Sequence, residues 1–365
     1  MEGKLLELSK IFQIEGEFLG FKEIGNGHVN STYCVRVLND EKEERYVFQK
    51  INTYVFKDPV GVMKNISSVT EFIRRKIESS GRNADRAVLR YCKTANGDYY
   101  HILEDGSFWR CYRYIDDSIA SLRAENEYII EQSGRAFGEF QKYLFDYPVS
   151  ELNIVIPHFH NTILRFSAFR EALENNLSDR KHLVAEEIAG FFALEEVACE
   201  PYKMQVRREI PLRVTHNDTK TSNVLFDKTT GERLCVIDLD TVMPGLVAFD
   251  FGDAIRVGAN TADEDEKDTA KAGLDLVKYE AFTKGFLEEV SSFVTDNEKR
   301  SLPLGAIAMT VECGVRFLTD YLNGDKYFRV HYPEHNLVRA RCQLALARDM
   351  LKNFDAMQEI VKKYS

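Results

Sequence analysis

A polar segment between two apolar, strand-like runs limits what this chain can fold into more than any other feature. Leu212-Arg213-Val214 precedes the segment and Val224-Leu225-Phe226 follows it. The segment itself is His216-Asn217-Asp218-Thr219-Lys220-Thr221-Ser222-Asn223. Apolar and β-branched runs separated by a polar stretch indicate two strands joined by a loop. Because the loop carries a carboxylate, an ammonium and an amide at fixed spacing, it predicts a catalytic site and not a solvated turn.

The segment fits the pattern H-x-D-x-x-x-x-N of a kinase catalytic loop. In that chemistry a carboxylate accepts a hydrogen bond from the attacking hydroxyl, which we assign to Asp218. Asn223 can return to the same site and bind a metal ion that touches the phosphates. Lys220 can reach the transferred phosphoryl group and neutralise the charge that develops there. The loop therefore predicts phosphoryl transfer.

A second carboxylate follows the next apolar run. Leu234-Cys235-Val236-Ile237 leads directly into Asp238, which we predict to hold Mg²⁺ on the phosphates of ATP. On an extended chain Asp240 would point the same way and could bind or support the metal. Asp250-Phe251-Gly252 spells another kinase motif, but no apolar strand leads into it. We expect Asp250 to be a buried acid that anchors the loop.

Phosphate-binding residues are expected near the N-terminus. Gly25 and Gly27 stand between two strand-like runs, where glycine lets backbone amides approach phosphates. A phosphate-anchoring cation belongs on the strand 46–51, where Gln49 and Lys50 point to opposite faces. Only one of the two can face the nucleotide, and the sequence does not decide between them. Glu71 is a candidate acidic partner on the following helix.

The order of elements predicts an α+β, two-lobed, protein-kinase-like fold. Residues 1–115 are strand-rich with one inserted helix at 60–79, and they form the predicted nucleotide-binding lobe. Residues 116–365 are mostly helical and form the lobe with the catalytic loop, the magnesium ligands and the acceptor site. Helical periodicity in this part is strongest over the ranges 122–144, 164–176, 180–197, 267–290 and 301–322.

Composition excludes several kinds of partner. A formal net charge of −10 lacks the basic footprint that binds nucleic acid or anionic membranes. The 7 cysteines are scattered and form no C-x-x-C pair, which is typical of reduced thiols in the cytoplasm. The N-terminus does not resemble a signal peptide, and we expect a soluble protein. His158 and His160 could bind zinc, but no further ligand lies nearby, so we expect loop packing.

With these residues in view, the chain resembles the aminoglycoside phosphotransferase and choline kinase superfamily, and within it the bacterial N-acetylhexosamine 1-kinases. The stretches that carry the resemblance are GNGHVNSTY at 25–33, QKINTYVF at 49–56, PLRVTHNDTK at 211–220, VIDLDTVMPG at 236–245, FDFGDAIRVGA at 249–259, ECGVRFLTDYLNGDKYF at 312–328 and YPEHNLVRAR at 332–341. Several of them lie outside the catalytic core that all kinases share.

The resemblance implies that ATP and an N-acetylhexosamine give ADP and the sugar 1-phosphate. It implies that Asp218 is the catalytic base and that Asn223 and Asp238 are the magnesium ligands. Adenine would lie near Arg113, Tyr114 and Ile115. The residues that fall at the family's sugar-binding positions are Arg316 and Tyr327, with His28 and Asn30 as weaker candidates.

Two other functions remain open at this stage. The core motifs are equally compatible with a kinase of another small alcohol, such as an aminoglycoside, choline, homoserine or another sugar. A non-catalytic pseudokinase would lack one of Asp218, Asn223 and Asp238, and all three are present. The preference between N-acetylglucosamine and N-acetylgalactosamine depends on contacts to one hydroxyl, which the sequence does not reveal.

Overall fold

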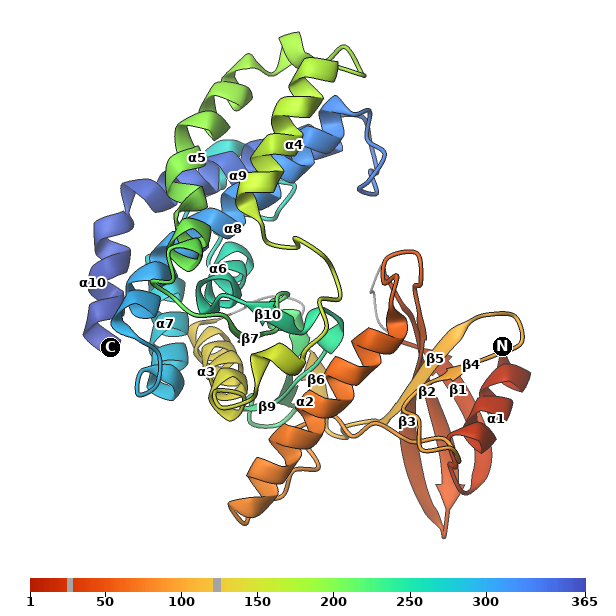
Figure 1. Cartoon of the computed structure of the whole chain (residues 1–365). Helices are drawn as coiled ribbons and strands as arrows, with labels where there is room; N and C mark the ends of the chain where they lie inside the picture. The colour runs from red at the N-terminus through yellow and green to blue at the C-terminus, as the bar shows by residue number, and fades with distance from the viewer. Residues whose placement is uncertain (25–28, 121–125) are drawn as a thin grey trace. The chain divides into compact units, whose positions relative to one another are not determined.

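The structure is a computed structural model that describes residues 1–24, 29–120 and 126–365. The chain divides into two compact units (Figure 1). Unit 1 consists of Met1–Ile119, Asp146–Pro157 and Leu225–Met243, and unit 2 of Ala120–Phe145, His158–Val224 and Pro244–Ser365. Residues far apart in the sequence therefore contribute to each unit.

Unit 1 is built on an antiparallel sheet of 5 strands in the order β1-β2-β3-β5-β4. Its elements are α1 (Glu2–Ile11), β1 (Glu17–Glu23), β2 (Ser31–Asn39), β3 (Lys42–Ile51), α2 (Pro59–Ser79), β4 (His101–Ile102) and β5 (Phe108–Arg113). The later segments of the chain add the 3-10 helix η1 (Val149–Glu151), the strands β8 (Val224–Asp227) and β9 (Arg233–Val236) and the 3-10 helix η4 (Leu239–Thr241). Strands β8 and β9 form a small sheet with β6 (Ser118–Ala120).

The two faces of the larger sheet differ in character. Side chains alternate along a strand, so Phe48 on β3 shares a face with Trp109 and Cys111 on β5, its neighbours in the register. This face packs against Leu5 and other apolar residues of α1 to form the core of the sheet. The opposite face carries Gln49 of β3 and Arg110 of β5, which are direct register partners. Gln49 and Arg110 therefore lie on the face away from α1.

Helix α2 joins separate parts of unit 1. Asp58 caps its N-terminus by accepting a hydrogen bond from the Gly61 amide, and Pro59 occupies its first turn. Asn65 is buried on this helix and donates hydrogen bonds to the carbonyls of Asn153 (2.8 Å) and Val242 (2.9 Å). Unit 1 therefore holds the turn after β9 in place through a side chain of α2.

Unit 2 is mainly helical. Its helices are α3 (Glu127–Tyr143), α4 (Thr162–Asn175), the 3-10 helix η2 (Lys181–Leu183), α5 (Ala185–Val206), the 3-10 helix η3 (Thr221–Asn223), α6 (Val247–Gly258), the 3-10 helix η5 (Thr269–Lys271), α7 (Leu276–Val290), α8 (Asp296–Leu322), α9 (His335–Lys352) and α10 (Phe354–Tyr364). The short strands β7 (Arg213–Thr215) and β10 (Met243–Gly245) pair with each other.

Helix α8 is the central helix of unit 2. Within the described residues it is the one helix long and apolar enough to cross a membrane, but 78% of its most apolar window is buried inside the protein. Its length and composition are therefore those of a core helix. Glycines bring it close to α6, because a Cβ on Gly305 would stand 2.0 Å from the Ala248 carbonyl oxygen. A Cβ on Gly252 would likewise stand 2.2 Å from the Gly305 carbonyl oxygen.

The structure confirms most of the predicted elements and shifts their ends. The predicted helix 180–197 begins at Ala185 and extends to Val206, and the predicted helix 267–290 begins only at Leu276. Within the strand-rich part, β4 consists of only two residues, His101–Ile102. Helices α6, α9 and α10 were not predicted, since buried residues on α6 and α9 fill more than one face and obscure the helical period.

Candidate active site

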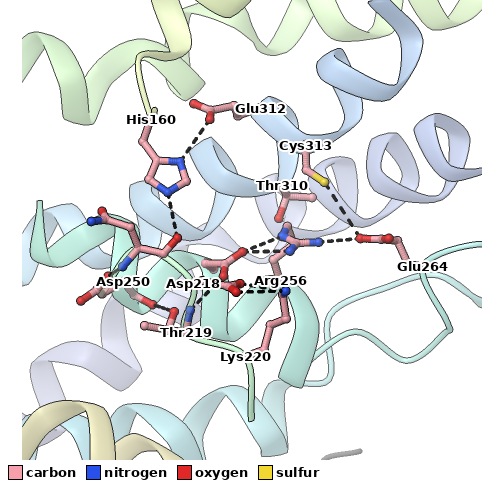
Figure 2. Close-up of polar contacts among 12 residues, drawn as sticks. His160, Asp218, Thr219, Lys220, Asp250, Arg256, Glu264, Thr310, Glu312 and Cys313 are labelled. Atoms are coloured by element: carbon pink, nitrogen blue, oxygen red, sulfur yellow. Dashed lines mark hydrogen bonds and ion pairs between the residues drawn. The ribbon is translucent and has the colours of Figure 1, made fainter. Parts of the chain in front are cut away.

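The catalytic loop of unit 2 brings together three residues that the sequence singled out, Asp218, Lys220 and Asn223, and Figure 2 shows the first two. The loop runs from the end of β7 into η3, so Asn223 turns back toward Asp218. Lys220 Nζ lies 2.9 Å from Asp218 Oδ1. The Asn223 amide Nδ2 donates to the Asp218 carbonyl (2.8 Å) and to Asp218 Oδ2 (3.2 Å). A carboxylate, an ammonium and an amide therefore converge within one loop.

Asp250 anchors this loop from α6. Its carboxylate accepts hydrogen bonds from the backbone amides of His216 (2.9 Å) and Asn217 (2.7 Å) and from Gln141 Nε2 (2.7 Å). The Asp250 side chain is buried, and Phe251 beside it packs between the aromatic rings of α7. The structure confirms that Asp250 is a buried anchor, and Gly252 serves the close packing of α6 on α8.

A second acid on α6 extends the anchor. Asp253 accepts a hydrogen bond of 3.1 Å from the Thr219 amide, one residue after Asp218. Arg256, one turn further along α6, donates to Asp253 Oδ1 and also bonds Glu264 (2.9 Å). Figure 2 shows the Arg256 guanidinium bonded to Glu264, near Lys220 and Asp218. The helix therefore supplies both an acceptor for the loop and a buried positive charge.

These charges change the proton affinities of the site. Burial alone would lower the pKa of Lys220, but the carboxylates of Asp218 and Asp253 outweigh it and raise that pKa. Burial would raise the pKa of Asp253, but Arg256 and Lys220 outweigh it and lower that pKa. Lys220 is therefore a fixed cation and Asp253 a fixed anion at neutral pH.

His160 connects the catalytic loop to α8 (Figure 2). Its Nε2 lies 3.2 Å from the Asn217 carbonyl oxygen, and its Nδ1 lies 3.1 Å from Glu312 Oε1. Glu312 is buried and also accepts a hydrogen bond of 3.0 Å from Thr162. Burial would raise the pKa of Glu312, but the hydrogen bond from His160 and the nearby arginines outweigh it and lower that pKa. His160 thus packs in a loop, as predicted, and its partners are polar.

Of the candidate acceptor residues, Arg316 lies one turn beyond Glu312 on α8, and Tyr327 lies in the loop that follows this helix. The Arg316 guanidinium carbon stands 5.4 Å from the ring centre of Phe328 and 5.9 Å from that of Tyr327. Asp320 holds the loop that carries both rings, because it accepts hydrogen bonds of 2.8–2.9 Å from the amides of residues 326–328. Tyr327 is 74% exposed. Arg316 and Tyr327, which the resemblance selected, are therefore neighbours.

In unit 1, Gln49 and not Lys50 shares a face with the buried polar groups. Arg110 Nε donates to Gln49 Oε1 (2.8 Å), and Gln49 Nε2 donates to Thr32 Oγ1 (3.2 Å). Lys50 is exposed on the other face. Glu71 on α2 is exposed and accepts a hydrogen bond of 3.2 Å from Tyr99.

One expectation about the magnesium segment is wrong. Asp240 does not point the same way as Asp238 on an extended chain, because Asp238 is left-handed (φ 61°) and residues 239–241 form η4. Asp240 is buried in an ion pair with Arg110 and accepts a hydrogen bond of 2.7 Å from Asn30 Nδ2. Asp238 is exposed at the start of this turn. The two carboxylates therefore have different surroundings.

The remaining predicted contacts are those of Gly25, Gly27, Arg113, Tyr114 and Ile115 with the nucleotide and that of His28 with the sugar. Gly25, Gly27 and His28 lie outside the described residues. The Arg113 and Tyr114 amides already donate, at 2.9 Å each, to the carbonyls of Arg90 and Arg45. Ile115 is buried, and its carbonyl accepts a hydrogen bond of 2.6 Å from Ser118. Their contacts with adenine stay predictions.

Each of the two predicted magnesium ligands, Asn223 in unit 2 and Asp238 in unit 1, has an oxygen donor suited to a magnesium ion. The Asn223 Nδ2 group is occupied by two acceptors of Asp218, which leaves Oδ1 as the amide atom that can face a cation. Asp238 adds an exposed carboxylate. Oxygen ligands from an amide and a carboxylate are those that Mg²⁺ takes, completed by phosphate and water. Among residues 1–24, 29–120 and 126–365 no cluster of three or more His, Cys, Asp or Glu side chains could hold a metal ion.

Four functional candidates were not predicted from the sequence: Arg110, Asp253, Arg256 and Glu312. Asp253 and Arg256 have a local signal, since spacings of three and six from Asp250 place them along the same helix. Arg110 and Glu312 have none, because their partners Asp240 and His160 are more than 100 positions away.

The fold and the catalytic loop define a small-molecule phosphotransferase. The chain matches the phosphotransferase enzyme family over residues 21–285 and belongs to that family. This membership confirms the prediction of an enzyme that transfers phosphoryl groups to small molecules.

Solved structures show the same fold. A microcompartment-associated aminopropanol kinase is similar over 98% of this chain and 99% of its own, with 10% identity and a TM-score of 0.62. The choline kinase of Cryptosporidium parvum is similar over 94% and 92%, with 14% identity and a TM-score of 0.56. A spectinomycin phosphotransferase in complex with ADP and spectinomycin is similar over 100% and 98%, with 15% identity and a TM-score of 0.53. These likenesses confirm the predicted two-lobed, kinase-like fold.

Proposed function

We propose that this protein transfers the terminal phosphoryl group of ATP to the anomeric hydroxyl of an N-acetylhexosamine, giving ADP and the sugar 1-phosphate. The observation that carries the phosphoryl transfer is the contact of 2.9 Å between Lys220 and Asp218, with Asn223 bonded to the same carboxylate. The choice of acceptor rests on the resemblance of residues 312–328 and 332–341 to N-acetylhexosamine 1-kinases.

In the proposed reaction the acceptor hydroxyl donates a hydrogen bond to Asp218. Its oxygen forms a bond to the terminal phosphorus while the bond from that phosphorus to the ADP oxygen breaks, and its proton passes to Asp218. An anomeric hydroxyl is more acidic than an ordinary alcohol, so a late proton transfer to a carboxylate is sufficient. Lys220 neutralises negative charge on the transferred group. Magnesium, held by Asn223 and Asp238, would neutralise the charge of the ATP phosphates.

Electrostatics at the candidate acceptor residues favour a neutral acceptor over a cationic one. Arg316 and Arg165 both lie close enough to Glu312 to lower the pKa of its carboxyl. Arg165 Nε lies 3.9 Å from Glu312 Oε1, and this buried carboxylate is already bonded to His160 and Thr162. The Arg316 guanidinium would repel a cationic alcohol such as choline, whereas the hydroxyls and amide of an N-acetylhexosamine can accept hydrogen bonds from it.

The alternative is a kinase of a small amino alcohol. It is favoured by the likeness in fold to the aminopropanol kinase and to the choline kinase of Cryptosporidium parvum. In either case we propose a cytoplasmic enzyme, where ATP is abundant and the free cysteines of the described residues stay reduced.

A panel of acceptors tests the proposal. Release of ADP from ATP and Mg²⁺ would be measured with N-acetylglucosamine, N-acetylgalactosamine, glucose, choline, ethanolamine and 1-deoxy-N-acetylglucosamine. We expect turnover with an N-acetylhexosamine and none with its 1-deoxy analogue, which lacks the reacting hydroxyl. Turnover of choline or ethanolamine without any sugar would replace the proposal by its alternative.

A further inference from the structure

Arg110 is a buried cation on the polar face of the unit 1 sheet. Only 1% of the residue is exposed, although it carries a guanidinium group. Its Nε donates to Gln49 Oε1 at 2.8 Å, and its Nη1 forms an ion pair with Asp240. Its guanidinium carbon also stands 5.9 Å from the Tyr91 ring centre. A buried arginine needs such partners, because an uncompensated charge in the interior is very costly.

Asp240 is held on both of its oxygens. Oδ1 belongs to the ion pair with Arg110, and Oδ2 accepts a hydrogen bond of 2.7 Å from Asn30 Nδ2. Asn30 is itself fixed, because its Oδ1 accepts a hydrogen bond of 2.9 Å from the Asn52 amide just after β3. The residue just before β2, the central strands and the segment after β9 therefore meet at one carboxylate.

This carboxylate belongs to the turn that begins with the candidate magnesium ligand. Asp238 has φ 61° and ψ 55°, a left-handed conformation that few side chains adopt without compensation. The turn closes with a hydrogen bond of 3.1 Å from the Val242 amide to the Leu239 carbonyl. Asn65 binds the Val242 carbonyl at 2.9 Å. The backbone that aims Asp238 is thus fixed at residues 240 and 242, and the first of these anchors is Arg110.

We propose that Arg110 is a positioning residue for the nucleotide–magnesium site, which clamps Asp240 and so fixes the turn that presents Asp238. The inference rests on the proposed function, and it deepens it by assigning a role outside the recognised motifs. It also explains why β3 needs no lysine on its polar face. The buried positive charge stands on the neighbouring strand β5, opposite the neutral Gln49.

A purely structural ion pair is the competing interpretation. Replacing a buried pair often changes stability alone, so loss of stability does not support the proposal. The two interpretations differ in the affinity of the folded protein for a divalent ion. If Arg110 fixes Asp238, its removal weakens metal binding in molecules that remain folded. If Arg110 only stabilises unit 1, the folded molecules bind metal as before.

The test measures Mn²⁺ binding in the presence of ADP by electron paramagnetic resonance, with no acceptor present. The variants are Arg110→Met, Arg110→Lys, Asp240→Asn and, as a matched control, Arg36→Met. Arg36, like Arg110, lies on a strand and pairs with an acidic residue, which for Arg36 is Glu43 at 3.6 Å. We expect Arg110→Met and Asp240→Asn to weaken Mn²⁺ affinity at least about tenfold, Arg110→Lys to weaken it less, and Arg36→Met to leave it unchanged.

Unchanged Mn²⁺ affinity in folded Arg110→Met would overturn the proposal. If that variant does not fold, Arg110→Lys and Asn30→Ala decide, since each loosens the clamp without burying an unpaired charge. We expect both to weaken Mn²⁺ affinity several-fold, and wild-type affinity in both would equally overturn the proposal. The measurement is independent of the acceptor, so a wrong assignment of the sugar would leave its outcome intact. Failure of the wild-type protein to bind Mn²⁺ with ADP would refute the role of Arg110 and the magnesium site together.

Discussion

The carboxylate of Asp250 accepts a hydrogen bond of 2.7 Å from the backbone amide of Asn217, the residue immediately before Asp218. The position of the proposed catalytic base is therefore set by a buried acid on α6. Two further donors, the His216 amide and Gln141 Nε2, occupy the other oxygen of that acid.

Asp250→Asn is expected to destabilise the protein and slow the reaction. The amide is the same size, but its NH₂ group would face at least one of three N–H donors in the interior. Leaving such a group unsatisfied costs about 1–3 kcal/mol. Thermal and denaturant unfolding would measure the loss, with exposed Asp355→Asn as a control expected to lie within about 0.5 kcal/mol of wild type. Equal stability of both variants would contradict the anchoring role of Asp250.

Asp218→Asn is expected to abolish phosphoryl transfer while nucleotide binding persists. The amide keeps the contact with Asn223 but cannot take the proton of the acceptor, so kcat should fall by about 10²–10⁴-fold. ADP affinity, measured by calorimetry, should stay within about threefold of wild type, or 0.7 kcal/mol. Near-normal turnover would show that Asp218 is not the base.

Arg316→Ala is expected to raise the KM of the sugar at least about tenfold, which corresponds to 1.4 kcal/mol, with little change in the KM of ATP. The reason is the loss of a guanidinium that lies against the rings of Tyr327 and Phe328. Arg329→Ala is a matched control, because Arg329 is exposed in the same loop. An equal rise in both KM values would indicate a structural role for Arg316.

The buried ring of His335 should make stability depend on pH. Burial and the nearby Arg339 lower its pKa, although Asp265 opposes the shift. Its Nδ1 accepts a hydrogen bond of 3.2 Å from the His331 amide, which requires an unprotonated Nδ1. The unfolded chain therefore binds a proton more readily, so stability is complete above the ordinary histidine pKa of about 6.5 and falls as the pH drops below it.

Urea unfolding at a series of pH values would measure this dependence. His335→Asn should reduce the slope of the unfolding free energy against pH below about 6.5, since asparagine keeps an acceptor without titrating. The exposed His182→Asn should leave the slope unchanged. The same slope in wild type and His335→Asn would refute the interpretation.

Local chemistry could be predicted from the sequence where a motif and its partners are only a few positions apart. The spacing of Asp218, Lys220 and Asn223 predicted that the three residues return to one site, and in the structure Lys220 and Asn223 both contact Asp218. Asp250 was predicted to be a buried anchor because no apolar strand leads directly into it, although the amides it binds lie more than 30 positions earlier. In the catalytic loop, by contrast, a few consecutive residues determine the geometry.

Contacts between distant segments could not be predicted. Strand alternation predicted that Asp240 points the same way as Asp238, but the left-handed Asp238 breaks that alternation. The Asp240 carboxylate pairs instead with Arg110, which lies on a strand 130 positions earlier. Nothing in residues 146–157 or 225–243 indicates that they pack with the first 119 residues. Such pairings depend on the tertiary fold, and the periodic pattern of a short stretch of sequence does not reveal them.

The measurement that tests the central claim most directly is ³¹P NMR of the product formed from ATP, Mg²⁺ and an N-acetylhexosamine. We predict a new phosphomonoester signal whose phosphorus is coupled to the anomeric proton of the sugar, together with ADP. A phosphomonoester coupled instead to the protons of another sugar carbon, or the absence of any sugar phosphate while ADP still binds, would contradict phosphorylation at the anomeric hydroxyl.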